Sequence, residues 1–104
     1  MRKASVSTHV LDVGLGLPAA GLEVSLHLEG KLVASARTDA GGRVAELGKG
    51  LEPGAYRLVF ETGEYFKERD HLFERVTLDF RLDSEHHHVP LLLGPYSCTS
   101  YRGS

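Results

Sequence analysis

The feature that most constrains this chain is a repeated alternation of apolar and polar residues. Within residues 22–29, leucine or valine occupies every second position, and the residues between them are charged or polar. Residues 76–82 repeat the pattern with Val76, Leu78, Phe80 and Leu82. Successive side chains of a β-strand point to opposite faces, so this period of two puts one row in a core and the other in solvent. The alternation therefore predicts half-buried strands.

Other segments extend this pattern along the chain. Turn-forming residues separate them, in the sequences GLGLPAAG, TDAGGR and LEPGAY. Short strands at this spacing are typical of a β-sandwich. The segment TGEYFKERDH lacks the period of two, and there Thr62 can cap a short helix with Glu64 in its first turn. We predict an all-β chain with one short helix and further strands at residues 5–13, 32–38, 56–61, 86–93 and 96–102.

The size and charge of the chain narrow its class. Its 104 residues suit a single domain over residues 1–104, because compact domains commonly contain about 100–150 residues. A net charge of -2 offers no basic surface for a phosphate backbone. No apolar run approaches the ~20 residues that cross a bilayer. We therefore expect one domain that binds neither nucleic acid nor membranes.

Cysteine usage and the chain start suggest a compartment. Cys98 is the single cysteine, so a disulfide within the chain is impossible and a reducing environment is suitable. The opening MRKASVSTHV lacks the apolar centre of a signal peptide, and the last residues are not a peroxisomal Ser-Lys-Leu. We expect a cytoplasmic protein.

Histidine is abundant, with six in the chain and three in a row at positions 86–88. In a strand, His86 and His88 share one face and His87 takes the other. Two histidines on one face can bind zinc, but structural zinc sites usually have four protein ligands and catalytic sites three. From spacing alone, a polar strand edge is favoured over a catalytic role, and a metal site ranks third.

Other reactive side chains have equally ordinary interpretations. His9 in STHVLDV suits a hydrogen-bonded surface imidazole, Arg43 after DAGG suits a solvated hairpin charge, and Ser104 suits a mobile chain end. The chain contains no GxSxG, P-loop, GxGxxG or HExxH motif. These residues by themselves predict a histidine-rich sandwich and no particular reaction.

The last residues, HHHVPLLLGPYSCTSYRGS, resemble the C-terminal signature of the transthyretin-related 5-hydroxyisourate hydrolases, H-x-H-V-P-L-L-L-x-P-Y-x-x-x-x-Y-R-G-S. The segments STHVLDVGLGLPAAG, RTDAGGRV and GAYRLVFETGEYF resemble further blocks of that family, in the same order, so the resemblance covers essentially the whole chain. Departures include Cys98 for an aromatic residue, Ser100 for threonine, and FERV without its usual proline. Tyrosine is common at position 87, so the resemblance implies that His87 is an incidental outward-facing substitution.

This resemblance implies a transthyretin-like sandwich of two antiparallel sheets that assembles as a homotetramer, with active sites at the dimer–dimer interface. It implies hydrolysis of 5-hydroxyisourate to 2-oxo-4-hydroxy-4-carboxy-5-ureidoimidazoline in urate degradation, without metal or cofactor. The catalytic residues of the family correspond here to His9, Arg43, His88 and Ser104. Its substrate-binding residues correspond to Arg43, Tyr101, Arg102, Gly103 and Ser104.

The implied chemistry suits these residue types. Imidazole has an ordinary pKa of about 6.5 and can accept a proton from water near neutral pH. Arg43 can stabilise the oxyanion or clamp the planar ring through paired donors. His9 and His88 would divide water activation and proton delivery to the leaving nitrogen, in an order that the sequence leaves open. Ser104 would position substrate or water through its hydroxyl and terminal carboxylate.

Two alternative functions remain open. A transthyretin-like protein that binds a small ligand without catalysis would share the sandwich and the tetramer, but such carriers lack the terminal YRGS and the histidines. Structural β-sandwich modules can also carry T-D-x-x-G-R and P-G-x-Y, but they need no particular C-terminus. A size measurement separates the module, a monomer, from either tetramer.

Overall fold

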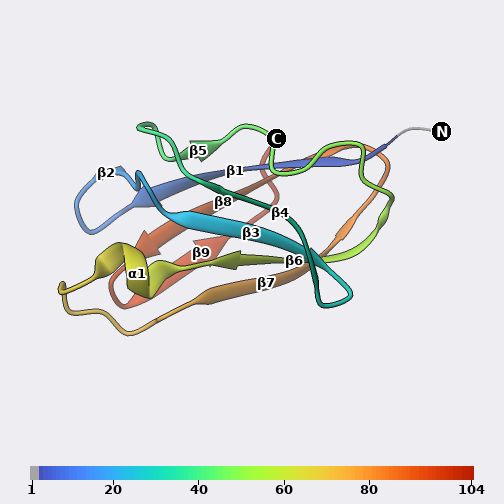
Figure 1. Cartoon of the computed structure of the whole chain (residues 1–104). Coiled ribbons are helices and arrows are strands. Elements are labelled where there is room, and N and C mark those ends of the chain that lie inside the picture. Colours follow the sequence, from blue (N-terminus) through green and yellow to red (C-terminus); the bar gives the residue numbers. More distant parts are fainter. Residues whose placement is uncertain (1–2) are drawn as a thin grey trace.

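Two β-sheets face each other in the computed structural model, which describes residues 3–104 (Figure 1). Its elements are β1 (Ser5–Asp12), β2 (Leu17–Pro18), β3 (Glu23–Leu28), β4 (Lys31–Arg37), β5 (Arg43–Val44), β6 (Gly54–Phe60), α1 (Thr62–Phe66), β7 (Val76–Leu82), β8 (His86–Gly94) and β9 (Ser97–Ser100). The first sheet has the order β2-β1-β8-β9 with β5 also on β1, and the second has the order β4-β3-β6-β7. The predicted two-sheet sandwich with one short helix is confirmed.

Each predicted strand forms, with ends shifted by no more than two residues. The predicted strand at residues 96–102 is the one that shortens most, because β9 ends at Ser100. The short strands β2 and β5 lie in segments that the sequence predicted as turns. No helix in residues 3–104 is long and apolar enough to cross a membrane.

The core consists of the apolar rows that alternation predicted. Leu22, Val24 and Leu26 are fully buried, and Leu28 packs against the core from a partly buried position. The apolar row of β7 is buried at both ends and partly buried in the middle. Burial of each such leucine is worth about 2 kcal/mol relative to exposure, which explains why one face of each strand turns inward.

The first sheet contains a parallel strand pair, β1 with β8. Ser7 lies opposite His88 in this pair, and His9 lies opposite Pro90. β5 pairs antiparallel with the other edge of β1, where Arg43 lies opposite His9. The remaining strand pairs of the described chain are antiparallel. This topology brings the start, middle and end of the sequence side by side.

A buried carboxylate fastens α1 and its following loop to the end of β1. Asp12 is fully buried and accepts hydrogen bonds from the Tyr65 hydroxyl at 2.7 Å, Arg69 Nη1 at 2.8 Å and the Leu15 N–H at 3.0 Å. Burial raises the pKa of Asp12, but these donors together bring it below the ordinary carboxyl value. The buried negative charge of Asp12 is therefore stabilised by three hydrogen-bond donors, one of which is the guanidinium of Arg69.

The helix forms where the sequence predicted it, but Thr62 does not cap it. The N-cap is Glu61, which makes no side-chain capping bond. Thr62 is the first helical residue, and its hydroxyl donates to the Phe73 carbonyl at 2.9 Å. Glu64 lies in the first turn as predicted and pairs with Arg37. Because Thr62 is buried, its hydroxyl bonds the next loop rather than the helix start.

Candidate functional site

The outward face of the first sheet carries most of the polar residues that the sequence singled out. Strand pairing puts His9 beside Arg43 and puts His88 on the opposite flank of β1. A cleft of about 310 Å³ lies on this face. It is lined by Ser7, Thr8, Arg43, Ala45, His86, His88 and Ser104. Three predicted catalytic residues thus share one cleft, and the fourth, His9, adjoins it.

Arg43 emerges from a turn that is closed by hydrogen bonds. The Asp39 carboxylate accepts from the N–H groups of Gly41 and Arg43, each at 2.9 Å. The Asp39 N–H donates to the Arg43 carbonyl at 2.9 Å, and the Val10 N–H donates to the Gly42 carbonyl at 2.7 Å. These bonds fix the turn to β1, so the direction in which Arg43 leaves it is also fixed.

His9 is oriented by the same turn. Its Nε2 lies 2.9 Å from the Gly41 carbonyl oxygen. A carbonyl oxygen can only accept, so Nε2 carries the ring proton. In the neutral ring, Nδ1 then has the free lone pair. The turn that presents Arg43 therefore also sets the tautomer of His9.

His88 is a partly buried histidine whose environment favours the neutral ring. Its Nδ1 lies 2.7 Å from Ser7 Oγ. Burial lowers the pKa of His88 below 6.5, and electrostatic interactions with His9, Arg43 and His86 lower it further. A neutral imidazole at pH 7 can accept a proton, which is the property that a general base requires.

The C-terminal residues return to β8 through Gly103. The Gly103 N–H donates to the His88 carbonyl at 2.7 Å. A Cβ atom at this glycine would lie 2.6 Å from His88 Cδ2, closer than carbon atoms approach, so a side chain cannot be accommodated without a shift. This close approach brings Ser104 to the cleft.

Two of the predicted substrate-binding residues lie away from this cleft. Tyr101 and Arg102 line a separate cavity of about 430 Å³ between the edges of the two sheets. Tyr101 is 54% exposed, and Arg102 forms an ion pair with Glu85. Within one chain, Gly103 and Ser104 are therefore the parts of YRGS that meet the other predicted residues.

Sequence reasoning did not name Ser7, and it placed His86 on the face of His88 without including it among the catalytic or substrate-binding residues. Both line the same cleft. Ser7 is buried, and its Oγ lies 2.9 Å from His86 Nε2. A signal was present, because the period of two puts Ser7 on the face of His9 and His86 on the face of His88. These two faces form one surface only because β1 pairs with β8, and local sequence does not encode that pairing.

His87 faces the inside of the protein, which corrects the expectation of an outward-facing residue. It is only 5% exposed. The prediction that His87 points to the other face of β8 from His86 and His88 is confirmed. His86 and His88, however, occupy the outward face that carries the cleft. The opposite face of β8 packs on the core, so position 87 is interior.

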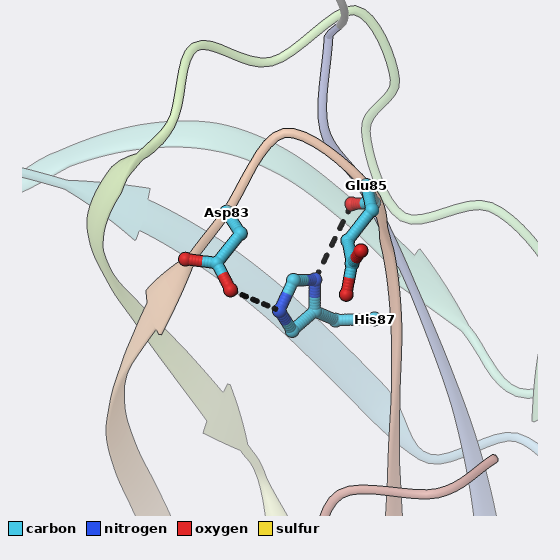
Figure 2. Close-up of side chains that lie close together, drawn as sticks. All are labelled: Asp83, Glu85 and His87. Atoms are coloured by element: carbon cyan, nitrogen blue, oxygen red, sulfur yellow. Dashed lines mark hydrogen bonds and ion pairs between the residues drawn. The ribbon is translucent and has the colours of Figure 1, made fainter.

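His87 belongs to a cluster with Asp83 and Glu85 where β7 leads into β8 (Figure 2). One ligand atom from each lies within 4.8 Å of the others, and these donor types suit divalent cations. His87 Nε2 lies 3.8 Å from Asp83 Oδ2, and His87 Nδ1 lies 3.3 Å from the Glu85 carbonyl oxygen. Because Arg102 already pairs with the Glu85 carboxylate, a cation would have to compete with it.

The turn before Arg43 offers a test of how the site is built. Gly42 has φ of +77°, and an added Cβ would overlap the Val10 carbonyl oxygen. Gly42→Ala is therefore expected to lower the free energy of unfolding by about 2 kcal/mol or more, measured by chemical denaturation. Gly41→Ala is the matched control, since its Cβ would meet only Asp39 Oδ1 at 3.5 Å. Equal stability of the two variants would contradict this account of the turn.

Known proteins are similar to this chain in both sequence and structure. Residues 6–103 match the model of the HIUase/Transthyretin family. The 5-hydroxyisourate hydrolase 2 of Rhizobium meliloti is 42% identical over 118 residues, which cover 99% of this chain and 98% of that protein. The structure of Klebsiella pneumoniae 5-hydroxyisourate hydrolase has a TM-score of 0.93 at 40% identity, covering 97% of this chain and 99% of that one. Sea bream transthyretin in complex with thyroxine has a TM-score of 0.86 at 25% identity, covering 94% and 93%.

These similarities extend over nearly the full length of both partners in each comparison. They agree with the two-sheet architecture and the single short helix described above. The fold is transthyretin-like, and the chain belongs to the HIUase/Transthyretin family.

Proposed function

We propose that this protein, as a single domain over residues 1–104, hydrolyses 5-hydroxyisourate to 2-oxo-4-hydroxy-4-carboxy-5-ureidoimidazoline in urate degradation. The observation that carries the proposal is the meeting of His88, Arg43 and Ser104 at one cleft, with the pKa of His88 lowered there. The near-full-length similarity to proteins named 5-hydroxyisourate hydrolase supports the same reaction.

His88 is the general base in this proposal. Burial and electrostatic interactions with Arg43 and the neighbouring histidines hold its pKa below 6.5, so the ring is neutral near pH 7. As water attacks the ring carbonyl, its oxygen bonds to carbon and one of its protons passes to His88. Such base catalysis contributes about 10²- to 10⁴-fold to the rate.

Arg43 stabilises the charge that this attack creates. The carbonyl oxygen becomes an oxyanion, and a guanidinium offers several N–H donors in one plane. The same fork can hold the planar, oxygen-rich substrate through two parallel hydrogen bonds. Ser104 lies at the same cleft and positions substrate or water through its hydroxyl.

His9 delivers the proton to the leaving nitrogen. Its Nε2–H is engaged by the Gly41 carbonyl, so Nδ1 is the ring atom that exchanges a proton with the substrate. In the resting neutral ring Nδ1 carries no proton, so it first takes one from water in the cleft and then gives it to the leaving nitrogen. The C–N bond breaks as the nitrogen gains this proton, and the ring opens. The two histidines thereby take separate steps, with His88 acting on water and His9 on the leaving group.

A homotetramer with sites at the interface between dimers fits the surfaces of the chain. β7 and β9 are sheet edges on the same side of the sandwich, and an open edge can pair with a second copy. A second sheet stacked on the outward face of the first would enclose the cleft. The proposed roles of Tyr101 and Arg102 in substrate binding require such an assembly, because neither lines the cleft of its own chain.

The cytoplasm is the proposed location of this enzyme. The lone cysteine, Cys98, is exposed and unpaired, and an exposed thiol stays reduced in the cytosol.

The function is tested by following ultraviolet absorbance after urate oxidase generates 5-hydroxyisourate in the cuvette. The intermediate should decay faster with the protein than without it. Arg43→Ala should lower kcat by about 10²- to 10³-fold, because it removes the oxyanion donor. Arg57→Ala is the matched control, since Arg57 pairs with Asp79 on the other sheet. Decay at the spontaneous rate with folded wild-type protein would overturn the proposal and favour a ligand-binding protein without catalysis.

A further inference from the structure

A row of hydrogen-bonded side chains extends from the cleft to the outer end of the sheet. His88 Nδ1 lies 2.7 Å from Ser7 Oγ, which lies 2.9 Å from His86 Nε2. His86 Nδ1 in turn lies 2.7 Å from Ser5 Oγ. Each distance is within the range of a well-formed hydrogen bond. We call this row, His88–Ser7–His86–Ser5, the Ser–His chain.

The parallel pairing of β1 with β8 creates the Ser–His chain. Ser5 lies opposite His86, and Ser7 lies opposite His88. Because side chains alternate along both strands, positions two apart remain on one face. The two serines of β1 therefore meet the two histidines of β8 on the outward face of the sheet.

We propose that the Ser–His chain is a proton relay, which carries the proton that His88 takes from water out of the cleft to solvent at Ser5. The relay deepens the proposed hydrolase function and rests on it. Ser7 and His86 are then positioning residues, since they act through His88 rather than on the substrate.

The available donors define the polarity of the relay. A hydroxyl has one proton to donate, and a neutral imidazole has one N–H and one lone pair. For Nε2 of His88 to accept a proton from the cleft, its Nδ1 must carry the ring proton and donate to Ser7. Ser7 then donates to His86 Nε2, and His86 Nδ1–H donates to Ser5. Every member of the chain is satisfied in this arrangement.

The transfer balances in protons. When one O–H bond of the attacking water breaks, that proton binds His88 Nε2. The Nδ1 proton of His88 passes to Ser7, the hydroxyl proton of Ser7 passes to His86 Nε2, and the Nδ1 proton of His86 passes to Ser5. The original proton of Ser5 leaves to solvent. After product release, His88 Nε2 loses its proton to water in the open cleft while Ser5 takes one from solvent, which restores the starting polarity.

The charges around His88 explain why a relay is useful there. Arg43 on β5, His9 on β1 and His86 on β8 all act on His88, and Ser104 lies at the same cleft. A positive charge retained on His88 would be repelled by the cations among these groups. His86 is exposed, so water solvates a charge that passes through it. Outward transfer therefore moves the proton to a more favourable position.

The polarity of the chain can be measured without turnover. In ¹⁵N-labelled wild-type protein, two-bond ¹H–¹⁵N correlation spectra distinguish the two tautomers of each neutral histidine. The expected result is the Nδ1–H form for both His88 and His86. His9 should show the opposite, Nε2–H form and serves as an internal contrast, because it donates to a carbonyl. The Nε2–H form at resting His88 would overturn the relay, whether or not the protein hydrolyses 5-hydroxyisourate.

Ser7→Ala interrupts the chain at its centre. We expect kcat to fall by about 10- to 100-fold, with a smaller change in KM. Rates in mixtures of H₂O and D₂O should depend on the deuterium fraction along a curve in wild type, since several protons move together, and along a straight line in Ser7→Ala. Ser7→Thr retains a hydroxyl and should recover most of the rate and the curvature.

The matched control is Ser25→Ala. Ser25 Oγ lies 2.9 Å from His27 Nε2, so this variant removes a similar serine–histidine bond from the opposite sheet. It should keep the wild-type kcat and the curved isotope dependence. Unchanged kcat in Ser7→Ala, or an equal loss in Ser25→Ala, would overturn the relay. Wild-type decay at the spontaneous rate would remove the proposed hydrolase function instead, and the tautomer spectra would still decide the polarity of the chain.

Discussion

His88→Ala is expected to lower kcat for 5-hydroxyisourate by about 10²- to 10⁴-fold. The variant leaves Arg43 and Ser104 at the cleft but removes the imidazole whose pKa is lowered there. Water must then attack without a base at this position. KM should change much less, because binding through the guanidinium is retained. The ultraviolet decay assay over a range of substrate concentrations measures both constants.

His27→Ala is the matched control for this prediction. His27 lies on β3 in the other sheet and bonds Ser25 there. Its replacement should leave kcat unchanged. A similar loss in both variants would mean that any lost histidine weakens the protein generally. Wild-type kcat in His88→Ala would remove His88 from the mechanism.

The same assay has an expected pH dependence. His88 acts as the neutral ring, so activity is lost when it becomes protonated as the pH falls. Burial and electrostatic interactions with Arg43 and the neighbouring histidines lower its pKa, which puts the midpoint of this loss below the ordinary 6.5. In Arg43→Ala the midpoint should move upward, because the guanidinium no longer disfavours the charged ring. A midpoint above 6.5 in wild type would contradict the assignment of the base.

Asp12→Ala is expected to cost about 3–5 kcal/mol of stability, because it breaks a buried charged network by removing one partner. The variant leaves the Tyr65 hydroxyl and the Leu15 N–H without their acceptor, and Arg69 without its counter-charge. The attachment of α1 to β1 is lost with these bonds. Chemical denaturation at matched protein concentration measures the effect, since assembly would make stability depend on concentration.

Asp79→Ala provides the comparison, because Asp79 pairs with Arg57 on an exposed surface. Exposed ion pairs contribute about 1 kcal/mol or less, so this variant should be close to wild type. Equal losses in the two variants would contradict the role given to Asp12. The pKa of Asp12 is lowered, so its contribution is complete above the ordinary carboxyl value of 3.8 and disappears as pH falls through the lowered pKa. The gap between wild type and Asp12→Ala should therefore narrow only in strong acid.

Much of the fold could be predicted because strand periodicity is a local property. Residues 76–82 alternate in the sequence and form β7 with the same bounds. The two-residue strands β2 and β5 could not be predicted, since two residues carry no period and their pairing depends on β1. The burial of Thr62 also depends on tertiary packing and could not be predicted. In its buried position the Thr62 hydroxyl bonds the Phe73 carbonyl and does not cap the helix.

The direction in which each histidine of β8 faces could also not be predicted from local sequence. Alternation correctly separated His87 from His86 and His88, but it does not say which face of β8 meets the core. Packing against the second sheet decided that His87 is buried. The proposed catalytic roles of His9, Arg43, His88 and Ser104 came from resemblance to a family, since no local motif indicated a reaction.

The sequence alone determined the all-β class, the positions of the main strands, the core rows and the candidate site residues. Only the tertiary structure decided that Ser7 lies beside His88, that Arg43 lies beside His9, and that Ser104 reaches the same cleft. The physical reason is that strand formation depends on neighbours one or two positions away. Strand pairing depends instead on how whole faces bury their apolar rows, and it joins residues that are distant in the chain.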